Sequence, residues 1–153
     1  MSDSVTIEII TPENYNEAGY TPDQLADFLF ENLDQFRDPR EQIMSCLDYA
    51  LGRQAARRGF ILAASDCDHN GTLLGVSVVC ETGMAGYVPE NLLVYIAVDS
   101  KARGRGVGKA LMEMAVETVR GDVALHVEHD NPARHLYERI GFTNKYLEMR
   151  YKK

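Results

Sequence analysis

The chain has 153 residues, of which 45% are hydrophobic and 25% charged, the balance typical of a soluble globular protein. This length suits one domain over residues 1–153, and no apolar run or signal-peptide pattern indicates a membrane or secretory segment. The net charge of −7 argues against a nucleic-acid partner, and the three cysteines lack the spacing of a metal site or disulfide framework. We therefore expect a reduced, cytoplasmic protein with no metal, no nucleic-acid partner and no membrane contact.

The first third of the chain predicts one strand and two helices. Residues 5–10 are rich in β-branched residues, which favour a strand. A capping-box pattern at residues 21–24 precedes apolar residues at helical spacing up to Phe36. A second start signal at residues 38–41 precedes an apolar stripe, which predicts a helix that continues to Gly59.

Three strands are expected in the middle of the chain, at residues 60–65, 72–80 and 92–98. Asn70 and Gly71 lie between the first two and form a strong hairpin signal. The third is an almost unbroken apolar run, which suggests a central strand covered on both faces.

The last third predicts a helix at residues 108–120, a short strand at 123–127 and a short helix at 131–140. Gly141 suits the C-terminal cap of that helix, and residues 145–151 predict a final strand. The order β-α-α-β-β-β-α-β-α-β predicts an α+β fold, with a mixed, mostly antiparallel central sheet flanked by helices.

Charge is distributed unevenly along the chain. Residues 1–50 hold eleven acidic residues against Arg37 and Arg40, a net charge of −9. Residues 99–109 carry Asp99 and a net charge of +3, from Lys101, Arg103, Arg105 and Lys109. A basic focus in an acidic chain suggests a local anion site, and a solvated helix start is the alternative.

The segment 103–109 reads Arg-Gly-Arg-Gly-Val-Gly-Lys and lies between the expected central strand and an amphipathic helix. Glycines let the backbone approach a ligand, and the free N–H groups of a helix start favour anions. A P-loop is excluded because only three residues separate Gly104 from Gly108. A dinucleotide fingerprint is excluded because Lys109 or Leu111 stands where its last glycine is required.

The spacing of Arg103, Gly106 and Gly108, directly after a strand that ends at Val98, resembles the acetyl-CoA signature Arg-x-x-Gly-x-Gly/Ala of the GNAT superfamily of N-acetyltransferases. A second block at residues 131–142, Asn-Pro-Ala-Arg-His-Leu-Tyr-Glu-Arg-Ile-Gly-Phe, is similar to the family's Asn…Ala-x-x-Leu-Tyr-x-x-x-Gly-Phe block. The expected element order matches as well, so the resemblance covers nearly the whole chain. It implies a GNAT-like fold, acetyl-CoA as co-substrate, and acetyl transfer to a primary amine.

The resemblance also implies site residues. In this family the backbone amides of the glycine turn, here residues 103–109, hold the pyrophosphate of coenzyme A. The central strand supplies N–H groups that stabilise the oxyanion. The residues of this chain that the resemblance implies as cofactor contacts are Ile96, Ala97, Val98, Arg103, Gly104, Arg105, Gly106, Val107, Gly108, Lys109, Asn131, Arg134 and Tyr137. Tyr137 is further implied as the general acid for the departing thiolate, since a phenol with a pKa near ~10 can donate a proton; simple packing of its ring is the alternative.

The general base is not given by the resemblance, because Leu93 stands where some members of the family carry a glutamate. Four side chains on or beside the flanking strands are candidates: Glu81, Tyr95, His126 and Glu128. His126 is named as the catalytic candidate, because histidine accepts a proton near neutral pH; a water relay is the alternative. Direct attack by the amine is favoured over an acyl-enzyme on Cys80, because nothing nearby in the sequence marks an activated thiolate.

The acidic first third contains the two helices that wall the acceptor side in this family, so we expect a cationic amine acceptor. The alternative is that the acidic residues solvate the outer helix faces, among them Asp23, Asp27, Glu31, Asp34 and Asp48. Two other activities stay open: transfer of a longer acyl group, and a non-catalytic acyl-CoA sensor. The sequence also leaves open the identity of the acceptor and whether the protein is a monomer or a homodimer.

Overall fold

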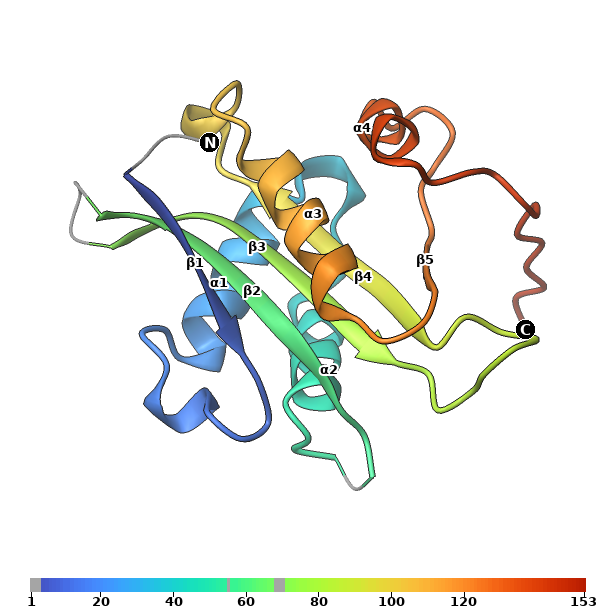
Figure 1. The fold of residues 1–153 in the computed structure, drawn as a ribbon, viewed down its shortest axis with the longest axis horizontal. Helices are drawn as coiled ribbons and strands as arrows, with labels where there is room; N and C mark the ends of the chain where they lie inside the picture. The colour runs from blue at the N-terminus through green and yellow to red at the C-terminus, as the bar shows by residue number, and fades with distance from the viewer. Residues whose placement is uncertain (1–3, 55, 68–70) are drawn as a thin grey trace.

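A five-stranded sheet in the order β1-β2-β3-β4-β5 forms the centre of the molecule (Figure 1). The computed structural model describes residues 4–54, 56–67 and 71–153. The strands are β1 (Val5–Ile10), β2 (Gly59–Asp66), β3 (Thr72–Glu81), β4 (Asn91–Val98) and β5 (Val123–Leu125). Neighbouring strands are antiparallel except β4 and β5, which are parallel. The predicted mixed, mostly antiparallel α+β sheet is therefore confirmed.

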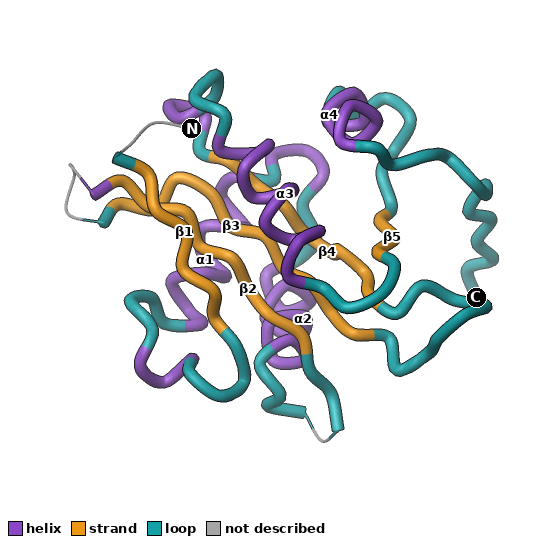
Figure 2. The backbone as a smooth tube through the Cα atoms, in the orientation of Figure 1, coloured by secondary structure: helices purple, strands orange, loops and turns teal. Residues whose placement is uncertain are grey.

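Helices cover both faces of this sheet (Figures 1 and 2). The helices are α1 (Pro22–Asn32), α2 (Arg40–Ala50), α3 (Val107–Thr118) and α4 (Ala133–Ile140). In Figure 1, α3 lies in front of the sheet and α1 and α2 lie behind it. The core on the α1 and α2 side includes Leu25, Leu29, Ile43, Leu47, Ile61, Val78 and Tyr95. The core on the α3 and α4 side includes Leu62, Val79, Leu93, Leu111, Met112 and Tyr137.

The first helix begins as the sequence predicts but ends earlier. The hydroxyl of Thr21 accepts a hydrogen bond from the Gln24 N–H at 3.1 Å, and the Thr21 N–H donates to the Gln24 side chain at 2.9 Å. Apolar spacing predicted a helix up to Phe36, whereas α1 ends at Asn32. Asp34 has a φ of +53°, a left-handed conformation that stops the helix, and a 3-10 turn over Asp34–Phe36 follows.

The second helix is also shorter than predicted, because α2 ends at Ala50 rather than near Gly59. Gly52 adopts a φ of +70°, which breaks the helical path two residues later. In the expected hairpin between β2 and β3, Asn70 lies outside the described residues and Gly71 has a φ of +74°. A glycine with positive φ suits the predicted turn.

The predicted final strand at residues 145–151 is not formed. Residues 142–153 have no helix or strand and run along the outer side of β5 (Figures 1 and 2). Large apolar side chains along this segment are 79–92% exposed, namely Tyr146, Leu147, Met149 and Tyr151. A strand needs a neighbour to satisfy its N–H and C=O groups, and β5, which spans Val123–Leu125 instead of the predicted 123–127, offers only three residues.

Within the described ranges, no helix combines the length and apolar character needed to cross a bilayer.

Candidate functional site

The edge of β4 that faces β5 is unpaired over its second half. Pairing between the two strands begins at Asn91 and ends at Leu93. On the other side, Leu93 and Tyr95 face consecutive residues of β3, which leaves Val94 as a β-bulge. From Val94 onward, no described strand pairs with this edge of β4. Its backbone groups are therefore available to a ligand.

The direction of these backbone groups follows from one hydrogen bond. The Asp99 N–H donates to the Leu74 carbonyl of β3 at 2.8 Å. Because N–H groups alternate between the two edges of a strand, those of Ile96 and Val98 point away from β3, and that of Ala97 points toward it. Of the three predicted contacts on this strand, Ile96 and Val98 thus present donors to the unpaired edge.

The chain passes from β4 through a 3-10 turn (Ser100–Ala102) into a glycine turn, and α3 then begins at Val107. Gly104 has a φ of +85° and Gly106 a φ of +78°, conformations that L side chains rarely adopt. A Cβ atom added at Gly104 would meet no atom within 4 Å, so the space beside the turn is open.

The start of α3 presents free amide groups next to this turn. The first hydrogen bond of the helix runs from the Ala110 N–H to the Gly106 carbonyl at 3.0 Å. In the described part of the chain, the N–H groups of Val107, Gly108 and Lys109 donate to no acceptor. Together with the helix dipole, three such donors favour an anion such as a pyrophosphate.

Arg105 holds the turn in place from the side of β2. Its guanidinium lies 3.2 Å from the Asp66 carboxylate and donates to the Ser4 hydroxyl at 3.1 Å. The Asp66 side chain is only 6% exposed, so this ion pair is largely shielded from solvent. The sequence predicted a cofactor contact at Arg105, and its side chain is engaged here within the protein.

Two other basic side chains of the turn lie at the surface. Arg103 pairs with Asp34 at 3.3 Å, which connects the turn to the segment between α1 and α2. Lys109 pairs with Glu113 at 3.8 Å along α3. Both cations are more than half exposed and add positive potential around the free amides.

Asn131, just before α4, and Arg134, within α4, are both predicted cofactor contacts and make local contacts. The carboxamide oxygen of Asn131 accepts a hydrogen bond from the N–H of Ala133, the first residue of the helix, at 2.9 Å. Arg134 pairs with Glu138 at 3.2 Å, one helical turn later.

Tyr137 is the one buried polar residue of α4, with 8% exposure. Its ring lies 6.3 Å from that of Phe142, and burial raises the pKa of its phenol above the ordinary value. Next to it, Leu136 packs near the start of α3, since a Cβ on Gly108 would lie 3.4 Å from the Leu136 Cδ2 atom. The second sequence block is therefore packed against the helix that follows the glycine turn.

The four candidates for the general base have different surroundings. His126 is exposed directly after β5, and Glu128 is exposed two residues later. Glu81 accepts a hydrogen bond from the Arg58 guanidinium at 3.0 Å. Tyr95 donates a hydrogen bond to the Asp38 carboxylate at 2.5 Å. The sequence did not single out Asp38, because the partners lie 57 positions apart and no local signal marks their contact.

Cys80 lies beside a second thiol rather than beside an activating base. Its Sγ atom is 3.8 Å from the Cys46 Sγ atom, and both cysteines are free. The hydrogen bond with Cys80 and burial raise the pKa of the Cys46 thiol. A Cys46 thiol that stays protonated cannot act as a base for Cys80, which agrees with the expectation of direct attack by an amine. Among the described residues, no three His, Cys, Asp or Glu side chains are grouped to hold a metal.

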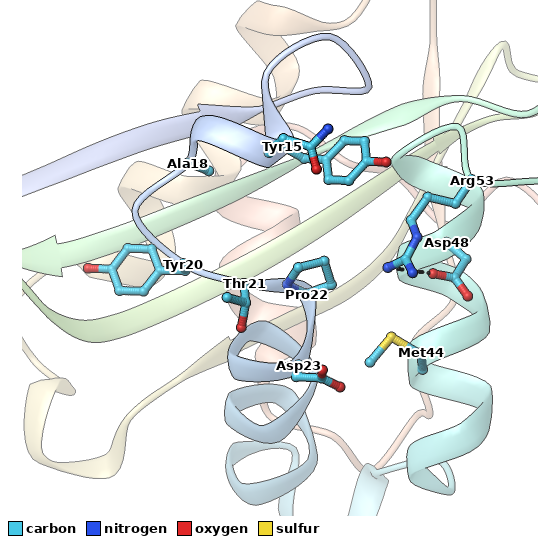
Figure 3. Close-up of a pocket in the computed structure, with 10 residues that line it drawn as sticks. Tyr15, Ala18, Tyr20, Thr21, Pro22, Asp23, Met44, Asp48 and Arg53 are labelled. Atoms are coloured by element: carbon cyan, nitrogen blue, oxygen red, sulfur yellow. Dashed lines mark ion pairs between the residues drawn. The ribbon is translucent and has the colours of Figure 1, made fainter.

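Two cavities open on the side of the sheet covered by α1 and α2. One, of about 360 Å³, adjoins the β4 bulge and is lined by Leu92 and Val94 of β4, by Cys46 and Tyr49 of α2, and by Glu81. The other, of about 510 Å³, lies between the start of α1 and the second half of α2 (Figure 3). Figure 3 shows the ion pair between Arg53 and Asp48 at its wall. No residue of β4 or of the glycine turn lines this larger cavity, so the smaller one is the better candidate for a substrate site.

Sequence comparison identifies relatives of this chain. The profile of the Acetyltransferase (GNAT) domain matches residues 56–144. A mycothiol acetyltransferase from Rhodococcus erythropolis is 37% identical over 99 residues, which cover 61% of this chain and 33% of that protein. A 5-NmdU N-acetyltransferase from Pseudomonas phage PaMx11 is 36% identical over 91 residues, which cover 58% of this chain and 61% of that protein. The matches thus span about a third and about three fifths of these curated relatives.

Structural comparison gives the same fold. An aminoglycoside N-acetyltransferase solved in complex with CoA superimposes with a TM-score of 0.67 at 15% identity, over 97% of this chain and 94% of that one. The family profile covers more than half of the chain and includes the unpaired strand edge, the glycine turn and α4. This protein therefore belongs to the family of GNAT acetyltransferase domains.

Proposed function

We propose that residues 1–153 form a single domain that acts as an acetyl-CoA-dependent N-acetyltransferase on a primary amine. The observation that carries the proposal is the continuity between the unpaired edge of β4 and the free amides at the start of α3. An elongated ligand with a pyrophosphate at one end and a polar amide chain at the other matches this path. Both curated relatives are named for acetyl transfer, and one of them for transfer to nitrogen.

The glycine turn fits the pyrophosphate of coenzyme A. The N–H groups of Val107, Gly108 and Lys109 would bind its oxygens, and Gly104 leaves room for the phosphates to approach the backbone. Arg103 and Lys109 add positive charge, and Arg105 fixes the turn through Asp66. The predicted contacts of Asn131 and Arg134 remain part of the proposal, with α4 packed against the start of α3.

Bound acetyl-CoA supplies an activated thioester. The N–H groups of Ile96 and Val98 would stabilise the negative charge that develops on the carbonyl oxygen during direct attack. Tyr137 would donate its proton to the departing sulfur. Burial supports this role, because a raised pKa keeps the phenol protonated throughout the neutral range.

The acceptor also has to lose a proton before or during attack. His126, exposed at the end of β5, is the proposed base, and a chain of water molecules is the alternative. We further propose a cationic acceptor, drawn by the net charge of −9 on residues 1–50.

A thermal-shift titration combined with a thiol-release assay tests the proposal. CoA should raise the melting temperature, because a ligand that binds only the folded state stabilises it. Acetyl-CoA with a panel of primary amines should then release free thiol. Stabilisation by CoA without turnover would point to a binding module, and faster turnover with longer acyl-CoA would point to a different acyl group.

A further inference from the structure

Within the described residues, Asp38 makes one hydrogen bond, to a tyrosine of the central strand. The Tyr95 hydroxyl donates to the Asp38 Oδ2 atom at 2.5 Å, and Tyr95 is 8% exposed. Burial, and then this hydrogen bond, raise the pKa of the Tyr95 phenol. Tyr95 therefore stays the proton donor of this hydrogen bond, which orients the Asp38 side chain.

Asp38 differs from the other aspartates of this region in having no cationic partner. Asp23 and Asp27 both pair with Arg40, at 3.2 and 2.8 Å. Asp34 pairs with Arg103, and Asp48 pairs with Arg53, at 3.3 and 3.2 Å. Among the described residues, no lysine, arginine or histidine forms an ion pair with Asp38. A half-buried carboxylate of this kind has an unbalanced charge and open acceptor positions for one cation.

The position of Asp38 is central to the proposed reaction. The segment between α1 and α2 contacts the glycine turn through Asp34 and Arg103, and it contacts β4 through Asp38 and Tyr95. Tyr95 directly precedes Ile96, the first proposed oxyanion donor. The Tyr95 side chain thus ties the carboxylate to the part of β4 where these donors begin.

The cavity beside the bulge provides access on the same face of the sheet. It is lined by Val94, the residue before Tyr95, and by Cys46, whose pKa is raised in part by the charge of Asp38. An amine in this cavity would therefore lie against Cys46, which feels the charge of Asp38, and against Val94, where the unpaired edge of β4 begins.

From this arrangement we infer that Asp38, oriented by Tyr95, binds the ammonium group of the acceptor amine. The inference rests on the proposed acetyltransferase function and assigns its acceptor subsite. A carboxylate that already accepts one O–H bond retains positions for two N⁺–H donors, so a primary ammonium fits it. A neutral amide or alcohol of the same shape lacks the charge and should bind poorly.

Steady-state kinetics of the full chain with n-butylamine, 1,4-diaminobutane and benzylamine test the assignment. Asp38→Asn keeps the shape and removes the charge, so the KM for each amine should rise at least about tenfold, while kcat changes less. Tyr95→Phe should raise the KM by a smaller factor, because the carboxylate remains but loses its orienting hydrogen bond. The affinity for CoA, measured by calorimetry, should stay within about twofold in both variants.

Glu41→Gln is the matched control, since Glu41 is an exposed carboxylate three residues away in the first turn of α2. It should change neither KM nor CoA affinity, and circular dichroism should show all variants folded. Turnover by the wild type with an unchanged KM in Asp38→Asn would overturn the acceptor assignment and leave the acetyltransferase function standing. Binding of CoA by the wild type without thiol release from any amine would overturn both.

Discussion

The Arg105 guanidinium lies 3.2 Å from the Asp66 carboxylate and thereby ties the glycine turn to the end of β2. Arg105→Gln breaks an ion pair to a nearly buried carboxylate, so the free energy of unfolding should fall by about 1–3 kcal/mol. Urea denaturation at pH 7 measures the loss. Lys109→Gln, which breaks an exposed ion pair, should cost less than about 1 kcal/mol. Equal losses in the two variants would contradict a structural role for the Arg105 pair.

Gly106→Val should abolish CoA binding. A β-branched side chain at a φ of +78° distorts the turn and fills the space beside the amides of α3. Gly83→Val is the matched control, because Gly83 has a φ of +76° in the loop between β3 and β4, away from the turn. Calorimetric titration with CoA should show binding in the control only. A Gly106→Val protein that binds CoA as tightly as the wild type would refute the turn as the pyrophosphate site.

Tyr137→Phe removes one hydroxyl and keeps the ring contact with Phe142, so the fold should persist. General acid catalysis contributes about 100- to 10,000-fold, so kcat should drop at least tenfold with little change in CoA affinity. Because burial raises the Tyr137 pKa, the acid form should persist above about pH 10, and any loss of rate from its ionisation should begin only there. Tyr146→Phe, at an exposed position, is the control. An unchanged kcat, with chemistry rate-limiting, would leave Tyr137 as a packing residue.

Alkylation should distinguish the three cysteines. Cys67 is exposed, whereas Cys46 and Cys80 are shielded and lie against each other. Iodoacetamide at pH 8 should therefore modify Cys67 first, and the raised pKa of the Cys46 thiol should delay its reaction further. Peptide mass spectrometry over time gives the order. Rapid labelling of Cys80 would reopen the acyl-enzyme route.

Ionic strength should separate a dication from a monoamine. If the acidic first third steers the acceptor, kcat/KM for 1,4-diaminobutane should fall as salt shortens the Debye length from about 10 Å at 0.1 M to about 3 Å at 1 M. The value for n-butylamine should fall less. Ion pairs already neutralise Asp23, Asp27, Asp34 and Asp48 in part, so the difference should be modest. Equal salt responses of the two amines would indicate that the acidic residues solvate the helix faces and do not steer the acceptor.

The sequence predicts the elements that depend on local chemistry. The capping box at Thr21 and the glycines of the turn depend only on residues close by in the sequence. The helix start and the turn can therefore be predicted from the sequence alone. The failed strand at residues 145–151 has the right side-chain pattern, but a strand also needs a partner, and pattern alone does not provide one. The ends of α1 and α2 were predicted too late because apolar spacing continues past Asp34 and Gly52, where the backbone turns left-handed.

The sequence predicted only part of the site, because local signals lie within one segment whereas tertiary contacts join distant ones. The glycine turn is a continuous segment, and its free amides follow from the start of a helix. The bulge at Val94 depends on the register between β3 and β4, and the contact of Asp38 with Tyr95 joins an interhelical segment to a strand. Both arise from tertiary packing, which no short segment of sequence encodes.

The Asp34–Arg103 pair connects the segment that carries Asp38 to the turn proposed for coenzyme A. If both ligands bind better when this ion pair is formed, each strengthens the binding of the other. Thermodynamic linkage requires the factor to be the same in both directions. An exposed ion pair contributes at most about 1 kcal/mol, which corresponds to about fivefold in affinity. The two substrates should therefore bind in a weakly synergistic manner, in either order, rather than by an obligatory sequence.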